Sequence, residues 1–192
     1  MSSAFRFDRW VRLTMAGWVL GIPILILISQ LAEAAGIGGA QVWVGAGMGF
    51  GVGLMQQRAL RELLERPLHW LWPSTLGLAL PFLITDLVPA IPYSIYACVI
   101  AGGMLTGLGQ AWLLRRSLPR PYLWIVASTA GWICAAGGVA VADRLQQMRL
   151  LSGVWGALAF LGAVACGGIL LALITGACLH FSLRQSVLAP NQ

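Results

Sequence analysis

Six long apolar stretches, separated by short breaks, decide what this chain can fold into. They cover approximately residues 13–32, 42–60, 71–88, 93–114, 122–142 and 154–183. Each approaches or exceeds the roughly 20 residues that a helix needs to cross a bilayer core of about 30 Å. Every backbone amide in hydrocarbon must be satisfied within its own segment, and no run here alternates as a barrel strand would. The sequence therefore predicts an all-α membrane protein with six transmembrane helices.

Composition excludes a globule in water. Hydrophobic residues make up 59% of the chain and charged residues 9%, with a mean hydropathy of +0.83. Too few polar side chains remain to cover a soluble core. No break is long enough to hold a soluble domain, so we expect a single integral membrane domain over residues 1–192. The first stretch is too long for a signal peptide and lacks a small-residue cleavage site, so we expect it to be retained.

One segment of the sequence occurs twice. Residues 49–77 match residues 103–131 at a fixed offset of 54, with thirteen of 29 positions identical. Each copy holds the end of one apolar stretch, a basic turn and the start of the next. A landmark of Trp, then Ser or Thr four residues on, then Gly three further begins at Trp10, Trp70 and Trp124. The sequence therefore predicts an internal repeat of three helical hairpins, at about residues 10–62, 68–117 and 121–186.

Small residues at every fourth position, mostly glycines, mark the second, fourth and sixth stretches, with Ala172 between the two glycines of the sixth. Small residues at this spacing share one helix face and let a neighbouring backbone approach closely, which favours helix packing. The alternative is a crevice for a flat pigment, lipid or quinone. The stripe residues are Gly45, Gly49, Gly53, Gly103, Gly107, Gly168 and Gly176.

Arginine placement predicts the orientation. Ten of the twelve basic residues lie in the N-terminal arm, the second and fourth breaks and the C-terminal end, and only Arg144 and Arg149 lie opposite. The positive-inside rule then places both termini on the cytoplasmic side. Topology alone accounts for the sequence pI near 9.9, so we expect no nucleic-acid partner. The candidates for contact with anionic lipid head groups or an acidic partner are Arg61, Arg66, Arg115, Arg116 and Arg120.

Two glutamines lie about one turn beyond the last glycine of their stripe. An amide at that depth needs a hydrogen-bond partner, and the Ser or Thr of the repeated landmark on the adjacent helix fits geometrically. For Gln56 and Gln110 we therefore expect a structural interhelical bond, with a ligand contact as the alternative.

Three acidic residues, Glu33, Asp86 and Asp143, close the odd-numbered stretches on their outer side. A carboxylate in or beside hydrocarbon is costly and is a functional candidate. A structural role at the interface, an ion or proton pathway, and a partner contact all remain open. Asp86 is the strongest candidate because no arginine is nearby.

The cysteines, the tryptophans and the absence of catalytic motifs give little information about function. The four cysteines lie inside apolar stretches and are interpreted as small buried residues. Five tryptophans are assigned to an aromatic belt at the cytoplasmic surface. They are Trp10, Trp70, Trp72, Trp112 and Trp124. No nucleophile, metal or phosphate-binding motif is present, so we expect neither an enzyme nor a metal site, and the sequence identifies no cofactor.

The repeated strings carry a resemblance. GLGQAWLLRRSLPRPYLWIVASTAGW and GVGLMQQRALRELLERPLHWLWPSTLGL resemble a group of uncharacterised bacterial membrane proteins, frequent in cyanobacteria. That group repeats G-x-x-Q-W-x-x-L-R-R followed by W-x-x-x-S-x-x-G-W. Gln57 replaces the first Trp of this pattern, and Ala111 displaces Trp112 by one position. The resemblance implies a placement in the bacterial cytoplasmic membrane or a thylakoid, and implies no chemistry.

Two functional hypotheses follow. In the first, the chain is a non-enzymatic subunit, scaffold or assembly factor that packs against other membrane helices, against itself or against a pigment or lipid. In the second, it is a small transporter or a substrate-binding membrane component with intramembrane carboxylates. A transporter should gather Asp86, Asp143 or Gln110 in one cavity, whereas a packing subunit should present a glycine face outward. Most of the repeated polar residues lie toward the ends of the stretches, which favours the first hypothesis.

Overall fold

The computed structural model describes residues 5–61, 67–147 and 153–188. Within those ranges the regular structure is helical and contains no β-strand. The α-helices are α1 (Phe7–Ala34), α2 (Val42–Ala59), α3 (Leu71–Leu87), α4 (Ile95–Leu114), α5 (Tyr122–Gln147) and α6 (Gly153–Leu188), and a 3₁₀ turn (Pro67–Trp70) precedes α3. The predicted all-α fold is confirmed, and each α-helix contains most of one predicted apolar stretch.

Local sequence explains several helix ends. Gly36 and Gly39 adopt φ angles of 77° and 81°, a region that glycine enters without strain, and they turn the chain from α1 into α2. The side chain of Ser94 accepts a hydrogen bond from the Ala97 amide and caps the start of α4.

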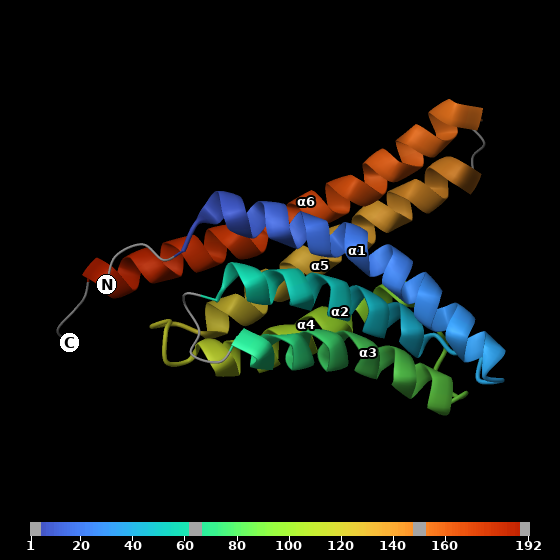
Figure 1. Ribbon diagram of the computed structural model, residues 1–192, viewed down its shortest axis with the longest axis horizontal. Coiled ribbons are helices and arrows are strands. Elements are labelled where there is room, and N and C mark those ends of the chain that lie inside the picture. The colour runs from blue at the N-terminus through green and yellow to red at the C-terminus, as the bar shows by residue number, and fades with distance from the viewer. Residues whose placement is uncertain (1–4, 62–66, 148–152, 189–192) are drawn as a thin grey trace.

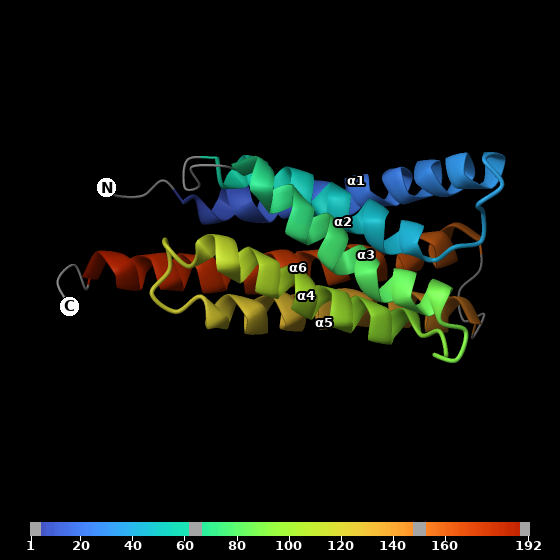
Figure 2. The same cartoon turned by 90° about the horizontal axis from the view of Figure 1, so that it is seen from below.

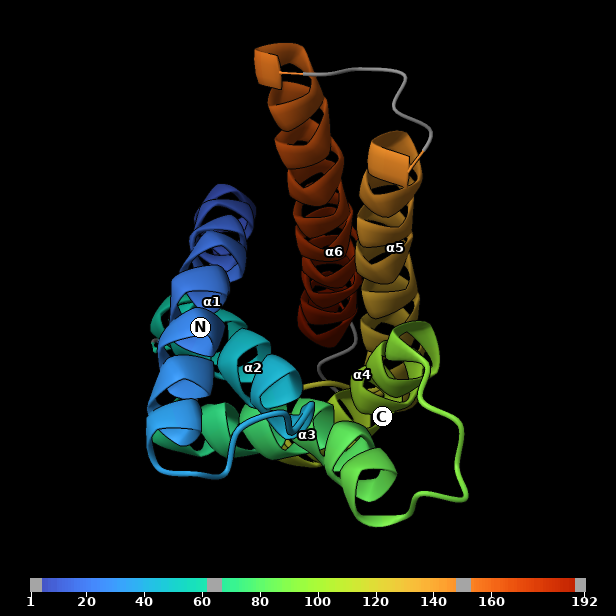
Figure 3. The same cartoon turned by 90° about the vertical axis from the view of Figure 1, so that its right-hand side faces the viewer.

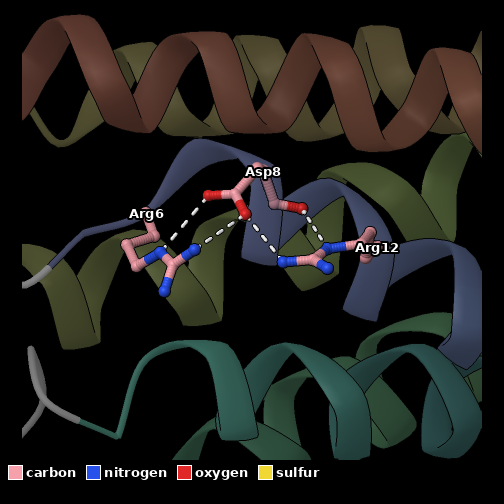
Figure 4. Close-up of polar contacts among 3 residues, drawn as sticks. All are labelled: Arg6, Asp8 and Arg12. Carbon is pink, nitrogen blue, oxygen red and sulfur yellow. Dashed lines mark hydrogen bonds and ion pairs between the residues drawn. The ribbon is translucent and has the colours of Figure 1, made fainter.

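The first helix begins six residues before its apolar stretch, and a charged cluster stabilises its first turn. Arg6 and Arg12 both donate to the carboxylate of Asp8, with closest distances of 3.1 and 2.7 Å, as Figure 4 shows. A carboxylate at this position also interacts favourably with the positive end of the helix dipole.

The helices form a ring in which each packs against the next in sequence and α6 closes against α1. The start of α1, the end of α6 and the α4–α5 connection lie at one end of the molecule (Figures 1 and 2). We call this the basic end, because the described arginines other than Arg144 lie in or near it. The opposite end, called the far end, holds Glu33, Asp86 and Asp143 at or near the ends of α1, α3 and α5.

The ring is not uniform along its length. Figures 1 and 3 show α5 and α6 diverging from α1–α4 toward the far end. In the basic half α6 approaches α1 closely, since a Cβ added at Gly176 would lie 2.7 Å from the Trp10 ring. Toward the far end α6 is exposed, with Val154 and Trp155 each 73% accessible.

The seven stripe glycines are buried inside the ring, and each faces an adjacent helix. A Cβ at Gly45 or Gly49 would lie 2.4 Å from a backbone carbonyl oxygen of α3, of Leu78 or Ser74 respectively. Gly103 faces Trp132 on α5, and Gly168 faces Trp18 on α1. Such contacts are typical of helices that approach through small residues.

Four helices are long and apolar enough to cross a membrane by length and composition: α1, α4, α5 and residues Gly153–Gln185 of α6. Helix α3 is apolar but has 17 residues. Helix α2 has 18 residues but ends in Gln56, Gln57 and Arg58, which lower its mean hydropathy.

Candidate functional site

Three fully buried tryptophans fill the ring near its basic end. Trp10, Trp70 and Trp124, here called the tryptophan triad, are each 0% exposed. Their ring centroids lie 5.7 to 6.4 Å apart, and the ring planes are inclined by 63 to 85°. Edge-to-face packing of this kind is a favoured aromatic geometry. Assigning these three to an aromatic belt was wrong, whereas Trp72 and Trp112 are each 60% exposed, as a belt requires.

Each indole N–H of the triad donates to a polar side chain on the preceding helix of the ring. Trp70 donates to Gln56 Oε1 over 3.2 Å, and Trp124 donates to Gln110 Oε1 over 2.9 Å. Trp10 donates to Thr175 Oγ1 over 3.2 Å.

The two glutamines bridge three helices each. Besides accepting from tryptophan, Gln110 Nε2 donates to Ser74 Oγ at 2.9 Å, and Gln56 Nε2 donates to Thr14 Oγ1 at 3.5 Å. The predicted bond to the Ser or Thr of the adjacent helix is therefore confirmed. Both glutamines are buried, and their bonds join neighbouring helices of the ring.

A wholly apolar pocket of about 280 Å³ lies between the diverging helices, on the far-end side of these polar groups. All six helices contribute to its lining. Representative residues are Ile22, Met48, Phe82, Tyr96, Val139 and Phe160. Trp18 and Trp132, whose ring centroids are 6.0 Å apart, lie in the core layer between the pocket and the polar side chains.

The pocket depends on how the helices diverge. Trp18 Nε1 donates to the Val164 carbonyl over 3.1 Å, which fixes α1 against α6 at the floor. Beyond this contact α6 moves away from α1 (Figure 3). Ile22 on α1 and Phe160 on α6 both line the pocket.

Asp86 has a structural task. Its two carboxylate oxygens accept hydrogen bonds from the backbone amides of Gln41 and Val42 at 2.9 and 2.8 Å. These amides belong to the start of α2 and have no partner within that helix, so the carboxylate on α3 caps its neighbour.

The structure does not bring the candidate acids together. Asp143 is half-buried at the end of α5, Glu33 is exposed on α1, and neither residue lines the apolar pocket. Gln110 lies deeper, among the polar side chains of the ring. Within the described ranges no three His, Cys, Asp or Glu residues are grouped as a metal site.

The arginine candidates are at the surface. Arg61, Arg115, Arg116 and Arg120 are exposed, and the Arg115 guanidinium lies 4.5 Å from the centroid of the exposed Trp112 ring. Arg66 lies outside the described residues.

The cysteines differ from the expectation that all four are buried, since Cys134 and Cys178 are only half-buried. Cys98 is buried, but Cys166 is exposed on α6, so the interpretation of all four as buried residues was wrong.

Sequence reasoning missed the triad and the pocket. A signal for the triad was present, since Trp, Ser or Thr, and Gly at positions i, i+4 and i+7 share one helix face. The glycine and hydroxyl of that face were interpreted as packing groups, so the tryptophan on the same face belonged inside as well. No sequence signal predicts the divergence of α5 and α6.

No protein-family model, curated protein or solved structure matches this chain. The resemblance to the repeated bacterial membrane proteins therefore stays a prediction.

Proposed function

We propose that this chain is an integral membrane protein that binds an apolar molecule from the bilayer in the far-end pocket. In this proposal all six helices span the membrane as three hairpins, with both termini in the cytoplasm. Helices α2 and α3, at about 1.5 Å per residue, are about 26 Å long and are held between longer neighbours. A local thinning of the bilayer accommodates that length.

The pocket is the observation that carries the proposal. Its volume of about 280 Å³ is nearly twice the roughly 150 Å³ of an engineered apolar cavity that binds benzene. It is near the lower limit of about 300 Å³ for ligand pockets. A wholly apolar lining offers no hydrogen bond to a polar solute, so the ligand portion inside is hydrocarbon. A lipid acyl chain or an isoprenoid chain has this chemistry.

Side chains fill the ring at the basic end, which supports a protein that binds a molecule and does not conduct it across the membrane. The tryptophan triad fills the ring there, with three indole N–H groups already bonded to Gln56, Gln110 and Thr175. A molecule in the pocket therefore meets a closed floor and leaves by the side through which it entered.

Of the two sequence hypotheses, we propose a form of the first, in which the chain is a non-enzymatic subunit or assembly factor that holds a lipid or pigment. The outward glycine face expected of a packing subunit was wrong, because the stripe glycines contact other helices of the same chain. A partner protein would contact the exposed apolar side chains of the outer surface instead. The transporter hypothesis is weaker because Asp86 is engaged in capping α2 and the carboxylates do not share a cavity.

The experiment is native purification in a mild detergent, followed by mass spectrometry and an absorption spectrum. We expect a co-purifying hydrocarbon-rich molecule that survives washing. Recovery of the chain with detergent alone, in repeated preparations from its native membrane, would contradict the proposal.

A further inference from the structure

A small polar cavity lies inside the ring, between the tryptophan triad and the floor of the apolar pocket. Its volume is about 10 Å³. Six polar side chains from five of the six helices line it, together with apolar neighbours. The polar residues are Gln56, Ser74, Thr106, Gln110, Ser128 and Thr175.

One of these side chains has no partner. Thr106 is 2% exposed, and its Oγ1 makes no hydrogen bond with any of the described residues. A buried hydroxyl without a partner loses its hydrogen bonds to water and gains none in the protein, which costs free energy. Groups of this kind in native proteins usually bind a protein atom or a water molecule.

Helix α6 lacks a glutamine at the position that corresponds to Gln56 in α2 and Gln110 in α4. Gln56 and Gln110 each follow a buried glycine by three residues, Gly53 and Gly107, but the residue three after Gly176 is Leu179. Leu179 is fully buried against the triad and offers neither an amide donor nor an acceptor.

Without an amide at Leu179, the hydrogen bonds of Trp10 and Ser128 differ from those of the equivalent residues in the other two hairpins. Trp10 donates to Thr175, one turn before Leu179, where Trp70 and Trp124 donate to glutamine. Ser128 Oγ donates to the Gly103 carbonyl at 3.0 Å and receives no bond from the described residues, whereas Ser74 Oγ receives the Gln110 amide.

We propose that the cavity binds one water molecule, which accepts a hydrogen bond from Thr106 Oγ1 and donates one to Ser128 Oγ. The water gives Ser128 Oγ a hydrogen bond like the one that Ser74 Oγ receives from the Gln110 amide. A buried water needs about 10–15 Å³ and two to four polar partners, and this cavity meets both conditions. Every lining group is neutral, which disfavours an ion because its charge would be buried without a counter-charge.

The test compares the thermal unfolding of three variants in detergent, followed by intrinsic tryptophan fluorescence. Thr106→Val removes the hydroxyl and keeps the shape. If water is bound, this variant loses a satisfied hydrogen bond, and Tm falls by about 2–4 °C. If the cavity is dry, the variant removes an unsatisfied hydroxyl and Tm rises.

Thr129→Val is the matched control, because the Thr129 hydroxyl donates to the Ile125 carbonyl of its own helix at 2.8 Å. The third variant, Thr106→Ser, keeps the hydroxyl and should unfold at a higher temperature than Thr106→Val. A Tm for Thr106→Val equal to or above that of the unmodified chain would overturn the proposal.

The Tm change of a single variant could also come from an empty space that the substitution leaves in the core. A double-mutant cycle tests the proposal in that case. Thr106→Val and Ser128→Ala should be non-additive, because either change removes a partner of the same water molecule. Simple additivity of the two Tm shifts would overturn the proposal.

Discussion

Gln110 joins three helices, and replacing it with leucine should weaken the bundle measurably. Its Oε1 accepts from Trp124 and its Nε2 donates to Ser74, each at 2.9 Å. Gln110→Leu removes both bonds and strands a buried indole N–H. Leucine is nonetheless tolerated sterically in this type of position, since Leu179 occupies the corresponding place in α6.

The expected loss can be worked from these contacts. Interhelical hydrogen bonds in a membrane are worth about 0.6 kcal/mol each on average, and stranding a buried donor costs about 1–3 kcal/mol. The added apolar contact of leucine offsets part of this, so we expect a net loss of about 1–3 kcal/mol. For a chain of this size that lowers Tm by about 2–12 °C.

Gln56→Leu provides the internal comparison. Its bonds to Trp70 and Thr14 are longer, at 3.2 and 3.5 Å, so its substitution should cost less than that of Gln110. Adding Trp124→Phe to Gln110→Leu removes the stranded donor and should cost less than the sum of the single variants. The assay is reversible unfolding in mixed micelles followed by far-UV circular dichroism. Equal stability of Gln110→Leu and wild type, or strict additivity of the double variant, would refute the reasoning.

Two further predictions follow from contacts on α2. Gly49→Ala places a Cβ 2.4 Å from the Ser74 carbonyl oxygen and should cost about 1–3 kcal/mol in thermal unfolding, whereas Gly137→Ala, with nothing within 4 Å, should be neutral or stabilising. Equal effects of the two would show that α2 does not pack closely on α3. Asp86→Asn should lose one of two capping bonds and lower stability by about 0.5–2 kcal/mol while leaving ion flux into vesicles unchanged. A changed flux with unchanged stability would contradict the capping role.

Much of the fold could be predicted because hydrophobic length alone determines where helices form in a bilayer. The apolar stretch at residues 42–60 became α2 (Val42–Ala59), with its start at the predicted residue. The Gln110 bond to Ser74 was also predictable. Glycines about one helical turn apart mark the face of α4 that packs inside, and a buried amide on that face needs a hydrogen-bond partner on the adjacent helix.

The role of Asp86 could not be predicted, because it depends on tertiary packing. Its partners, Gln41 and Val42, are more than forty positions away in sequence, and only the packing of α3 on α2 brings them together. The pocket was unpredictable for a related reason. A repeated hairpin implies equal packing of each unit, yet α5 and α6 separate from the other four helices toward the far end.

The triad was predictable in principle and was misassigned. Hydropathy places Trp10 near a membrane surface but does not distinguish a lipid-facing ring from one that faces the bundle. Helical spacing does, since Trp10, Thr14 and Gly17 share a face and all three are buried.

The location of the bound molecule is tested most directly by filling the pocket. Ala136 on α5 lines it, and Ala136→Trp should occupy the space that the ligand needs. Val126 on the same helix is 64% exposed, so Val126→Trp adds the same side chain outside. The measurement is the molar ratio of co-purified hydrocarbon-rich molecule to protein, in samples with matched helical content. We predict a strongly reduced ratio for Ala136→Trp and an unchanged ratio for Val126→Trp, whereas equal ratios would contradict binding in this pocket.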